Sequence, residues 1–108
     1  MIKGLVVKNG KLTEVETEVE LPDLYKLLKC EIIETHTYMI NGMPYLIVCD
    51  EEGMYDQEAP ITVMSKKTYR PVLVGNLFIC RENFQSLTET DINRIKLQWR
   101  HKALWSDL

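Results

Sequence analysis

The residues best suited to chemistry in this sequence flank Asn41-Gly42, a dipeptide that favours a two-residue hairpin turn. The segment 31–40 is rich in β-branched residues and leads through the turn into 43–49, so position 40 pairs with 43 and position 38 with 45. Because side chains alternate between the two faces of a strand, one face then collects an acid, a base, two phenols and a thiol. These residues are Glu34, His36, Tyr38, Tyr45 and Cys49.

One interpretation of this face is a concave ligand site in which Tyr38 and Tyr45 stack on a planar ring. His36 or Glu34 would then make polar contacts, and Arg70 would add a positive charge from elsewhere in the chain. The simpler interpretation is an amphipathic sheet face whose tyrosines pack structurally, and residue statistics favour it. We retain His36, Tyr38, Tyr45 and Arg70 as a candidate site for a small ligand, for instance a nucleotide.

Cys49 and His36 could also form a nucleophile and base pair, since they share this face. They are not directly opposite each other, and the sequence assigns no third group to orient the base. The sequence has no phosphate-binding Gly-rich loop, no His-x-x-x-His pair and no Gly-x-Ser-x-Gly motif. We therefore expect a protein without catalysis, cofactor or bound metal, whose three widely spaced cysteines stay reduced.

Two groups of acidic residues could each have a function, the first in segment 50–58 and the second in segment 14–20. The first could bind a divalent cation, but it lacks the ligand spacing of an EF-hand loop, so a solvated turn is the better interpretation. The second could imitate a nucleic-acid backbone, but a net charge of −3 is small for that purpose, and we favour a solubilising strand face. The first group is Asp50, Glu51, Glu52, Asp56 and Glu58, and the second is Glu14, Glu16, Glu18 and Glu20.

The elements that position these side chains follow from hydrophobic periodicity and turn signals. Asn9-Gly10 predicts a hairpin between strands 2–7 and 13–20, with Lys3 opposite Glu16. A short helix is expected over 22–29, a brief strand over 61–64 and a buried strand over 71–80 with a bulge at Gly75. The predicted class is α+β: a small mixed or mainly antiparallel sheet built from hairpins, packed by a C-terminal helix and one short helix, in a single domain 1–108.

The predicted C-terminal helix starts at Thr88, whose hydroxyl can cap a backbone N–H, with Asp91 three residues on. Its apolar stripe is expected to comprise Ile92, Ile95, Trp99 and Ala103. Trp105 lies off this stripe, so it could mark a partner surface or a dimer seam, although core packing or a frayed end is the plainer interpretation.

Composition narrows the class of protein. With 45% hydrophobic and 27% charged residues, the sequence is typical of a folded soluble protein. A net charge of −3 argues against nucleic acid as a partner. No run approaches the roughly 20 apolar residues of a membrane helix, and the first residues lack a signal-peptide layout, so we expect a cytoplasmic protein that binds no membrane.

Three short motifs occur in a distinctive order: Asp50-Glu51-Glu52-Gly53, then Gly75-Asn76-Leu77-Phe78, then Phe84-Gln85-Ser86-Leu87-Thr88. This order resembles a family of small domains of unknown function carried by bacteriophages, plasmids and other mobile elements. Members typically read Asn-Glu-Glu-Gly, Gly-Thr-Phe and Phe-x-Ser-Leu-Thr-Asp. The chain departs from the pattern at Asn76, where Thr is usual, and after Pro60, where relatives often carry an Asn-Arg pair.

The resemblance implies an accessory protein of a phage or mobile element, with interference in host defence as its context. The function we expect is a non-catalytic protein-interaction module that engages a host or phage protein, or a second copy of itself. The alternative is a small-ligand binder of the nucleotide type that sequesters a signal.

Overall fold

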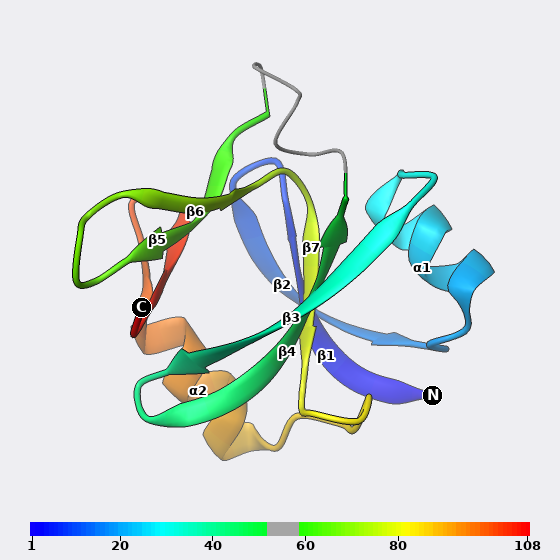
Figure 1. The fold of residues 1–108 in the computed structure, drawn as a ribbon. Coiled ribbons are helices and arrows are strands. Elements are labelled where there is room, and N and C mark those ends of the chain that lie inside the picture. Colours follow the sequence, from blue (N-terminus) through cyan, green and yellow to red (C-terminus); the bar gives the residue numbers. More distant parts are fainter. Residues whose placement is uncertain (52–58) are drawn as a thin grey trace.

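Two β-sheets and two helices make up residues 1–51 and 59–108, the parts of the chain that the computed structural model describes (Figure 1). The larger sheet has the order β2-β1-β7-β4-β3 and is antiparallel throughout. The smaller sheet has the order β6-β5-β9-β8, in which only β5 and β9 run parallel. The elements are β1 (Ile2–Lys8), β2 (Lys11–Thr17), α1 (Leu21–Leu28), β3 (Ile33–Ile40), β4 (Met43–Asp50), β5 (Ile61–Ser65), β6 (Pro71–Val74), β7 (Leu77–Cys80), α2 (Glu89–Leu97), β8 (Trp99–Arg100) and β9 (Ala103–Ser106). The predicted α+β class is confirmed, with two mainly antiparallel sheets where one was expected.

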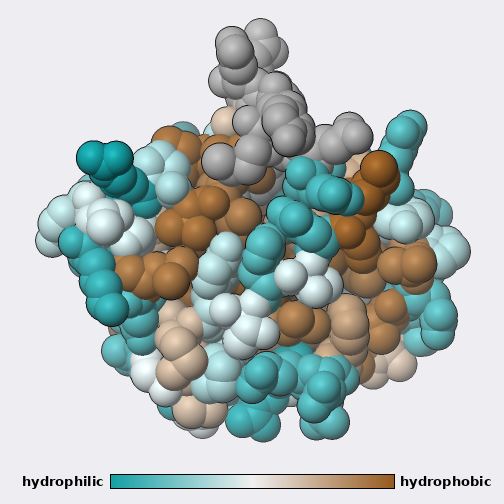
Figure 2. Space-filling model, viewed as in Figure 1, coloured by the Kyte–Doolittle hydropathy of each residue, from teal (hydrophilic) through white to brown (hydrophobic). Residues whose placement is uncertain are grey.

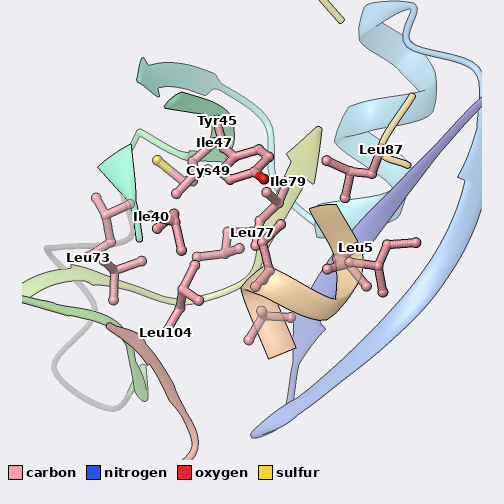
Figure 3. Packing of buried hydrophobic residues seen from close by; sticks show 14 residues of the cluster. Leu5, Ile40, Tyr45, Ile47, Cys49, Leu73, Leu77, Ile79, Leu87 and Leu104 are labelled. Atoms are coloured by element: carbon pink, nitrogen blue, oxygen red, sulfur yellow. The ribbon is translucent and has the colours of Figure 1, made fainter. Parts of the chain in front are cut away.

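The larger sheet is buried on both faces because its central strand alternates between two cores. In β7, Leu77 and Ile79 belong to the core shared with the smaller sheet and α2, whereas Phe78 and Cys80 belong to the core under α1. Figure 1 shows α1 on the opposite side from β5, β6 and α2. Figure 3 shows the first core from close by, with Ile40, Leu77 and Leu104 lying together although they come from three different strands.

Both predicted hairpins form with the expected registers. Asn9 and Asn41 have positive φ angles, and each is followed by a glycine that also has a positive φ angle, as a two-residue turn between twisted strands requires. Lys3 pairs with Glu16 in the first hairpin. In the second hairpin, Tyr38 pairs with Tyr45 and Glu34 with Cys49, so the face predicted from the sequence is present.

The C-terminal helix is shorter than its apolar spacing predicts. Thr88 and Asp91 form the expected capping box, but α2 ends at Leu97, and Gln98 caps it. The extension through Trp99 and Ala103 is wrong, because these residues lie in β8 and β9, joined by a tight turn. Trp105 therefore projects from a strand and not from a helix.

The predicted strand 71–80 is in fact two strands that belong to different sheets. Gly75 has a φ of +85°, a conformation that glycine adopts without strain, and it turns the chain from β6 into β7. The next residue fixes this corner to the first helix, because the Nδ2 of Asn76 donates a hydrogen bond of 3.0 Å to the carbonyl of Leu28. The expected bulge is thus a crossing between sheets.

Part of the predicted acidic group lies outside the described residues. These positions are Glu52, Asp56 and Glu58, together with Gly53 of the first motif. Neither helix in the described ranges is long and apolar enough to cross a membrane.

Asp107 joins the end of the smaller sheet to the turn of the central hairpin. Its carboxylate accepts hydrogen bonds from the backbone N–H of Asn41 at 3.1 Å and of Gly42 at 2.8 Å. The Lys66 ammonium lies 3.2 Å away, and the Asp107 N–H donates to the carbonyl of Met39. Burial alone would raise the pKa of this carboxyl, but the Gly42 N–H, the Lys66 ammonium and the Asn41 N–H together lower it.

Replacing Asp107 with Ala should lower the free energy of unfolding by about 1–2 kcal/mol at neutral pH, since charge-assisted bonds at a partly exposed carboxylate are lost. A lowered folded-state pKa stabilises the fold at pH values above the unfolded pKa and loses that effect as pH falls through the folded value. The difference between wild type and Asp107→Ala should therefore be constant near neutral pH and shrink below about pH 4. Urea denaturation at several pH values measures it, and a difference independent of pH would contradict the assignment.

Candidate functional site

The structure separates the four residues that the sequence groups as one ligand site. His36 and Tyr38 do lie together, with ring centroids 5.5 Å apart and planes inclined by 12°. Tyr38 also borders a cleft of about 350 Å³ at the open edge of β3. Tyr45 and Arg70 lie elsewhere.

Tyr45 is fully buried and belongs to a polar network around α2. Its hydroxyl donates a hydrogen bond of 2.7 Å to Oδ1 of Asp91 and accepts one of 2.8 Å from Arg94. Asp91 is 2% exposed and also pairs with the Nε of Arg81 at 3.2 Å. Tyr45 therefore holds the helix against the sheet, and the predicted stacking of Tyr38 and Tyr45 on one ligand is not what the structure shows.

Burial would raise the pKa of the Asp91 carboxyl, but its partners reverse that effect. The Thr88 backbone N–H and the hydroxyls of Tyr45 and Thr88 donate to it, and the Arg81 guanidinium adds a favourable charge, so its pKa is lowered. Asp91 is thus a buried carboxylate that stays ionised and stabilises the fold.

Arg70 and Trp105 are both found on the smaller sheet. Arg70 follows the turn between β5 and β6, where its carbonyl accepts a hydrogen bond from the N–H of Ser65. Trp105 lines a cleft of about 400 Å³, together with Lys66, Tyr69, Arg100 and His101. The cleft lies between the β5–β6 turn and the β8–β9 turn.

The Trp105 indole is fixed in place by groups of the cleft itself. Its Nε1–H donates a hydrogen bond of 3.1 Å to the carbonyl of Arg100, and the Arg100 guanidinium lies 5.4 Å from the ring centroid. Tyr69 meets the indole edge to face, with centroids 5.9 Å apart. Tyr69 is itself 74% exposed, so the cleft presents an aromatic ring to solvent.

The backbone at this cleft is strained where it presents two of the lining side chains. Tyr69 has a φ of +56° and His101 a φ of +55°, left-handed values that bulky residues rarely adopt. Such conformations cost free energy and persist where the surroundings impose them, frequently at functional sites. The two turns hold Tyr69 and His101 at the cleft.

The smaller sheet is basic, although the protein as a whole is acidic. The segments 59–74 and 98–108, which contain its strands and turns, carry five of the thirteen Lys and Arg residues but only one of the sixteen Asp and Glu residues, Asp107. The basic residues are Lys66, Lys67, Arg70, Arg100 and Lys102. The net charge of the whole chain therefore gave no indication of this positive region beside the rings of Tyr69 and Trp105.

A second cluster of reactive side chains lies on the central hairpin. The Nε2 of His36 is 3.0 Å from Oε1 of Glu34, and the Cys49 Sγ is 3.9 Å from the same oxygen. One ligating atom from each of the three residues lies within 4.8 Å of the others. Glu34 and Cys49 are cross-strand partners, and His36 follows two residues along β3.

This cluster does not provide an activated nucleophile. Burial raises the pKa of the Cys49 thiol to about 12, with the Glu34 and Asp50 carboxylates adding to the effect. A thiol in this state is protonated at neutral pH, whereas nucleophilic cysteines require a lowered pKa. The Cys49–His36 catalytic pair, which the sequence already disfavoured, gains no support.

Three residues of the Trp105 cleft were missed from the sequence: Lys66, Tyr69 and Arg100. The signal that could have found them was the repeated combination of aromatic and basic residues in 66–70 and 99–105. Only the parallel pairing of β5 with β9 brings these segments together, and such a long-range pairing leaves no local mark in the sequence.

The fold defines the class as a small α+β domain of two mainly antiparallel sheets with a basic, aromatic cleft on the smaller one. The chain belongs to the family described as Domain of unknown function (DUF3846), whose model matches residues 2–100. This confirms the expected domain of unknown function over nearly the whole chain. No curated protein and no solved structure matches it.

Proposed function

We propose that this domain binds a small anionic ligand that carries a planar ring, of the nucleotide type, in the Trp105 cleft. The observation that carries the proposal is the juxtaposition of Trp105 and Tyr69 with the cationic side chains of Arg100 and Lys66 around one cleft. Its volume of about 400 Å³ is in the usual range for small-molecule sites. This arrangement supports ligand binding, the alternative from the sequence, more than it supports a pure interaction role.

Different lining residues would bind the planar ring of the ligand and its anionic group. Tyr69, the more exposed aromatic ring, offers a stacking surface for a base, as aromatic side chains do in nucleotide and single-strand sites. Arg100 presents a guanidinium suited to bidentate contact with phosphate, and Lys66 supplies a second charge that Asp107 holds in place. Because, among the described residues, no carboxylate or thiol accompanies His101 in the lining, we propose binding without catalysis.

The motif order of the chain suggests where such binding would be used. We propose that the domain acts in an accessory protein of a phage or mobile element, where sequestering a nucleotide signal would interfere with host defence. A cytoplasmic location follows from that role.

A protein partner is the second candidate, and the 74% exposure of Tyr69 favours it. On the face viewed in Figure 2, hydrophobic residues gather in patches on the left and on the right, with hydrophilic residues between them. A protein partner at the cleft would engage it through an acidic segment, because Lys66 and Arg100 line the cleft.

The test is thermal stabilisation and equilibrium dialysis with nucleoside mono-, di- and triphosphates and dinucleotides. Matched nucleosides and inorganic phosphate separate the contributions of ring and anion. We expect a nucleotide to raise the melting temperature more than either fragment at equal concentration. No stabilisation by any nucleotide, with stabilisation by an acidic peptide instead, would replace ligand binding with protein interaction.

A further inference from the structure

We propose that Glu34, His36 and Cys49 form a binding site for a divalent transition metal ion of the zinc type. The site lies on the central hairpin and is independent of the Trp105 cleft. It runs against the expectation from the sequence that the protein binds no metal.

Two of the three distances between the ligating atoms are close to those around one tetrahedral ion, and all three atoms lie within 4.8 Å of one another. With metal–oxygen and metal–nitrogen bonds of about 2.1 Å and a metal–sulfur bond of about 2.3 Å, tetrahedral geometry separates oxygen from nitrogen by about 3.4 Å and oxygen from sulfur by about 3.6 Å. The corresponding separations are 3.0 Å from Glu34 Oε1 to His36 Nε2 and 3.9 Å from Glu34 Oε1 to Cys49 Sγ. Shifts of a few tenths of an ångström would bring both into place.

The imidazole of His36 is the group whose polar contacts are incomplete. Its Nε2 atom is buried, yet it makes no hydrogen bond within the part of the chain that the structure describes, although Oε1 of Glu34 lies 3.0 Å away. A buried polar atom without a partner is costly, and coordination to a metal ion would satisfy it. The stacked Tyr38 ring and the strand pairing of Glu34 with Cys49 hold the ligands in position.

The donor set selects the class of metal. Coordination would release the proton of the Cys49 thiol to solvent. The resulting thiolate, with an imidazole and a carboxylate, matches Zn²⁺ and its neighbours, whereas Ca²⁺ and Mg²⁺ prefer oxygen ligands. Figure 3 shows the Cys49 sulfur at the margin of the core cluster, and the His36 side chain is 34% exposed. The fourth coordination position would then face solvent and accept water.

The experiment is a Co²⁺ titration of the full chain under reducing conditions, followed in the near ultraviolet, with Zn²⁺ added afterwards as competitor. We expect a thiolate-to-cobalt charge-transfer band that Zn²⁺ abolishes. Cys49→Ser should remove the band, and His36→Gln and Glu34→Gln should each weaken Co²⁺ binding by at least about tenfold, since losses of even supporting groups reach that size. Cys30→Ser and His101→Gln are the matched controls and should bind as wild type does.

The outcome that overturns the proposal is the absence of a thiolate band in wild type, its persistence in Cys49→Ser, or unchanged affinity in His36→Gln. Each variant is first compared with wild type by metal-free thermal unfolding. If Cys49→Ser does not fold, His36→Gln and Glu34→Gln decide the question, because both keep the thiol.

Discussion

Asp91→Ala is expected to lower the free energy of unfolding by about 3–5 kcal/mol, the usual cost of breaking a buried charge network from one side. Asp91 is 2% exposed and accepts hydrogen bonds from the Tyr45 hydroxyl and the Thr88 backbone, while Arg81 and Arg94 pair with it. Its loss removes the carboxylate half of the capping box and leaves a buried phenol and a partly buried guanidinium without their anion. A loss of this size is a large fraction of the 5–15 kcal/mol typical of small domains.

Urea denaturation followed by circular dichroism measures this loss. Tyr45→Phe should cost less, about 1–2 kcal/mol, since it removes one hydroxyl from the network. The matched control is Glu89→Ala in the same helical turn, which breaks a surface ion pair with Lys3 and should cost less than about 1 kcal/mol. If Asp91→Ala destabilised no more than Glu89→Ala, the role given to the network would be wrong.

Arg100→Gln is expected to weaken nucleotide binding by about ten- to a hundredfold, because a charge-assisted contact with phosphate is worth about 1.5–3 kcal/mol. The guanidinium also covers the Trp105 ring, so the variant loses the group that orders the cleft. Arg100→Lys keeps the charge but not the planar fork and should fall between wild type and Arg100→Gln. Isothermal titration calorimetry gives all three affinities.

Lys102→Gln separates a specific contact from diffuse electrostatic attraction. Lys102 lies in the same turn as His101, but its side chain lies near Gly10, within about 4 Å of where a β-carbon would project, and it does not line the cleft. Its replacement removes the same formal charge and should change affinity less than about threefold near physiological ionic strength. An equal loss in both variants would point to general charge rather than to the cleft.

The sequence predicts what local signals control and fails where distant segments meet. Asn9-Gly10 and Asn41-Gly42 set both hairpin registers, and Thr88 with Asp91 sets the start of α2. The end of α2 was mispredicted, because Trp99 and Ala103 have helical spacing and the turn after Arg100 is formed by His101 and Lys102, which carry no turn signal.

The candidate sites also differ in whether local signals or contacts between distant segments form them. The register of the central hairpin is enough to place Glu34, His36 and Cys49 on one face of the sheet. The sequence therefore predicted this group of reactive side chains. The burial of Tyr45 depends on α2 packing over the sheet, and the cleft depends on β5 pairing with β9. Both depend on contacts between residues far apart in the chain, which periodicity does not reveal.

The most direct test of ligand binding at the cleft is a ¹H–¹⁵N NMR titration that follows the two tryptophan indole signals. Trp105 lines the cleft and its indole N–H is bonded to the Arg100 carbonyl, whereas Trp99 packs against the core and serves as an internal reference. Nucleotide should shift the Trp105 indole signal in a saturable manner and leave the Trp99 signal in place. Saturable shifts confined to His36 and Tyr38, or no shift of Trp105 at saturating nucleotide, would contradict the proposed site.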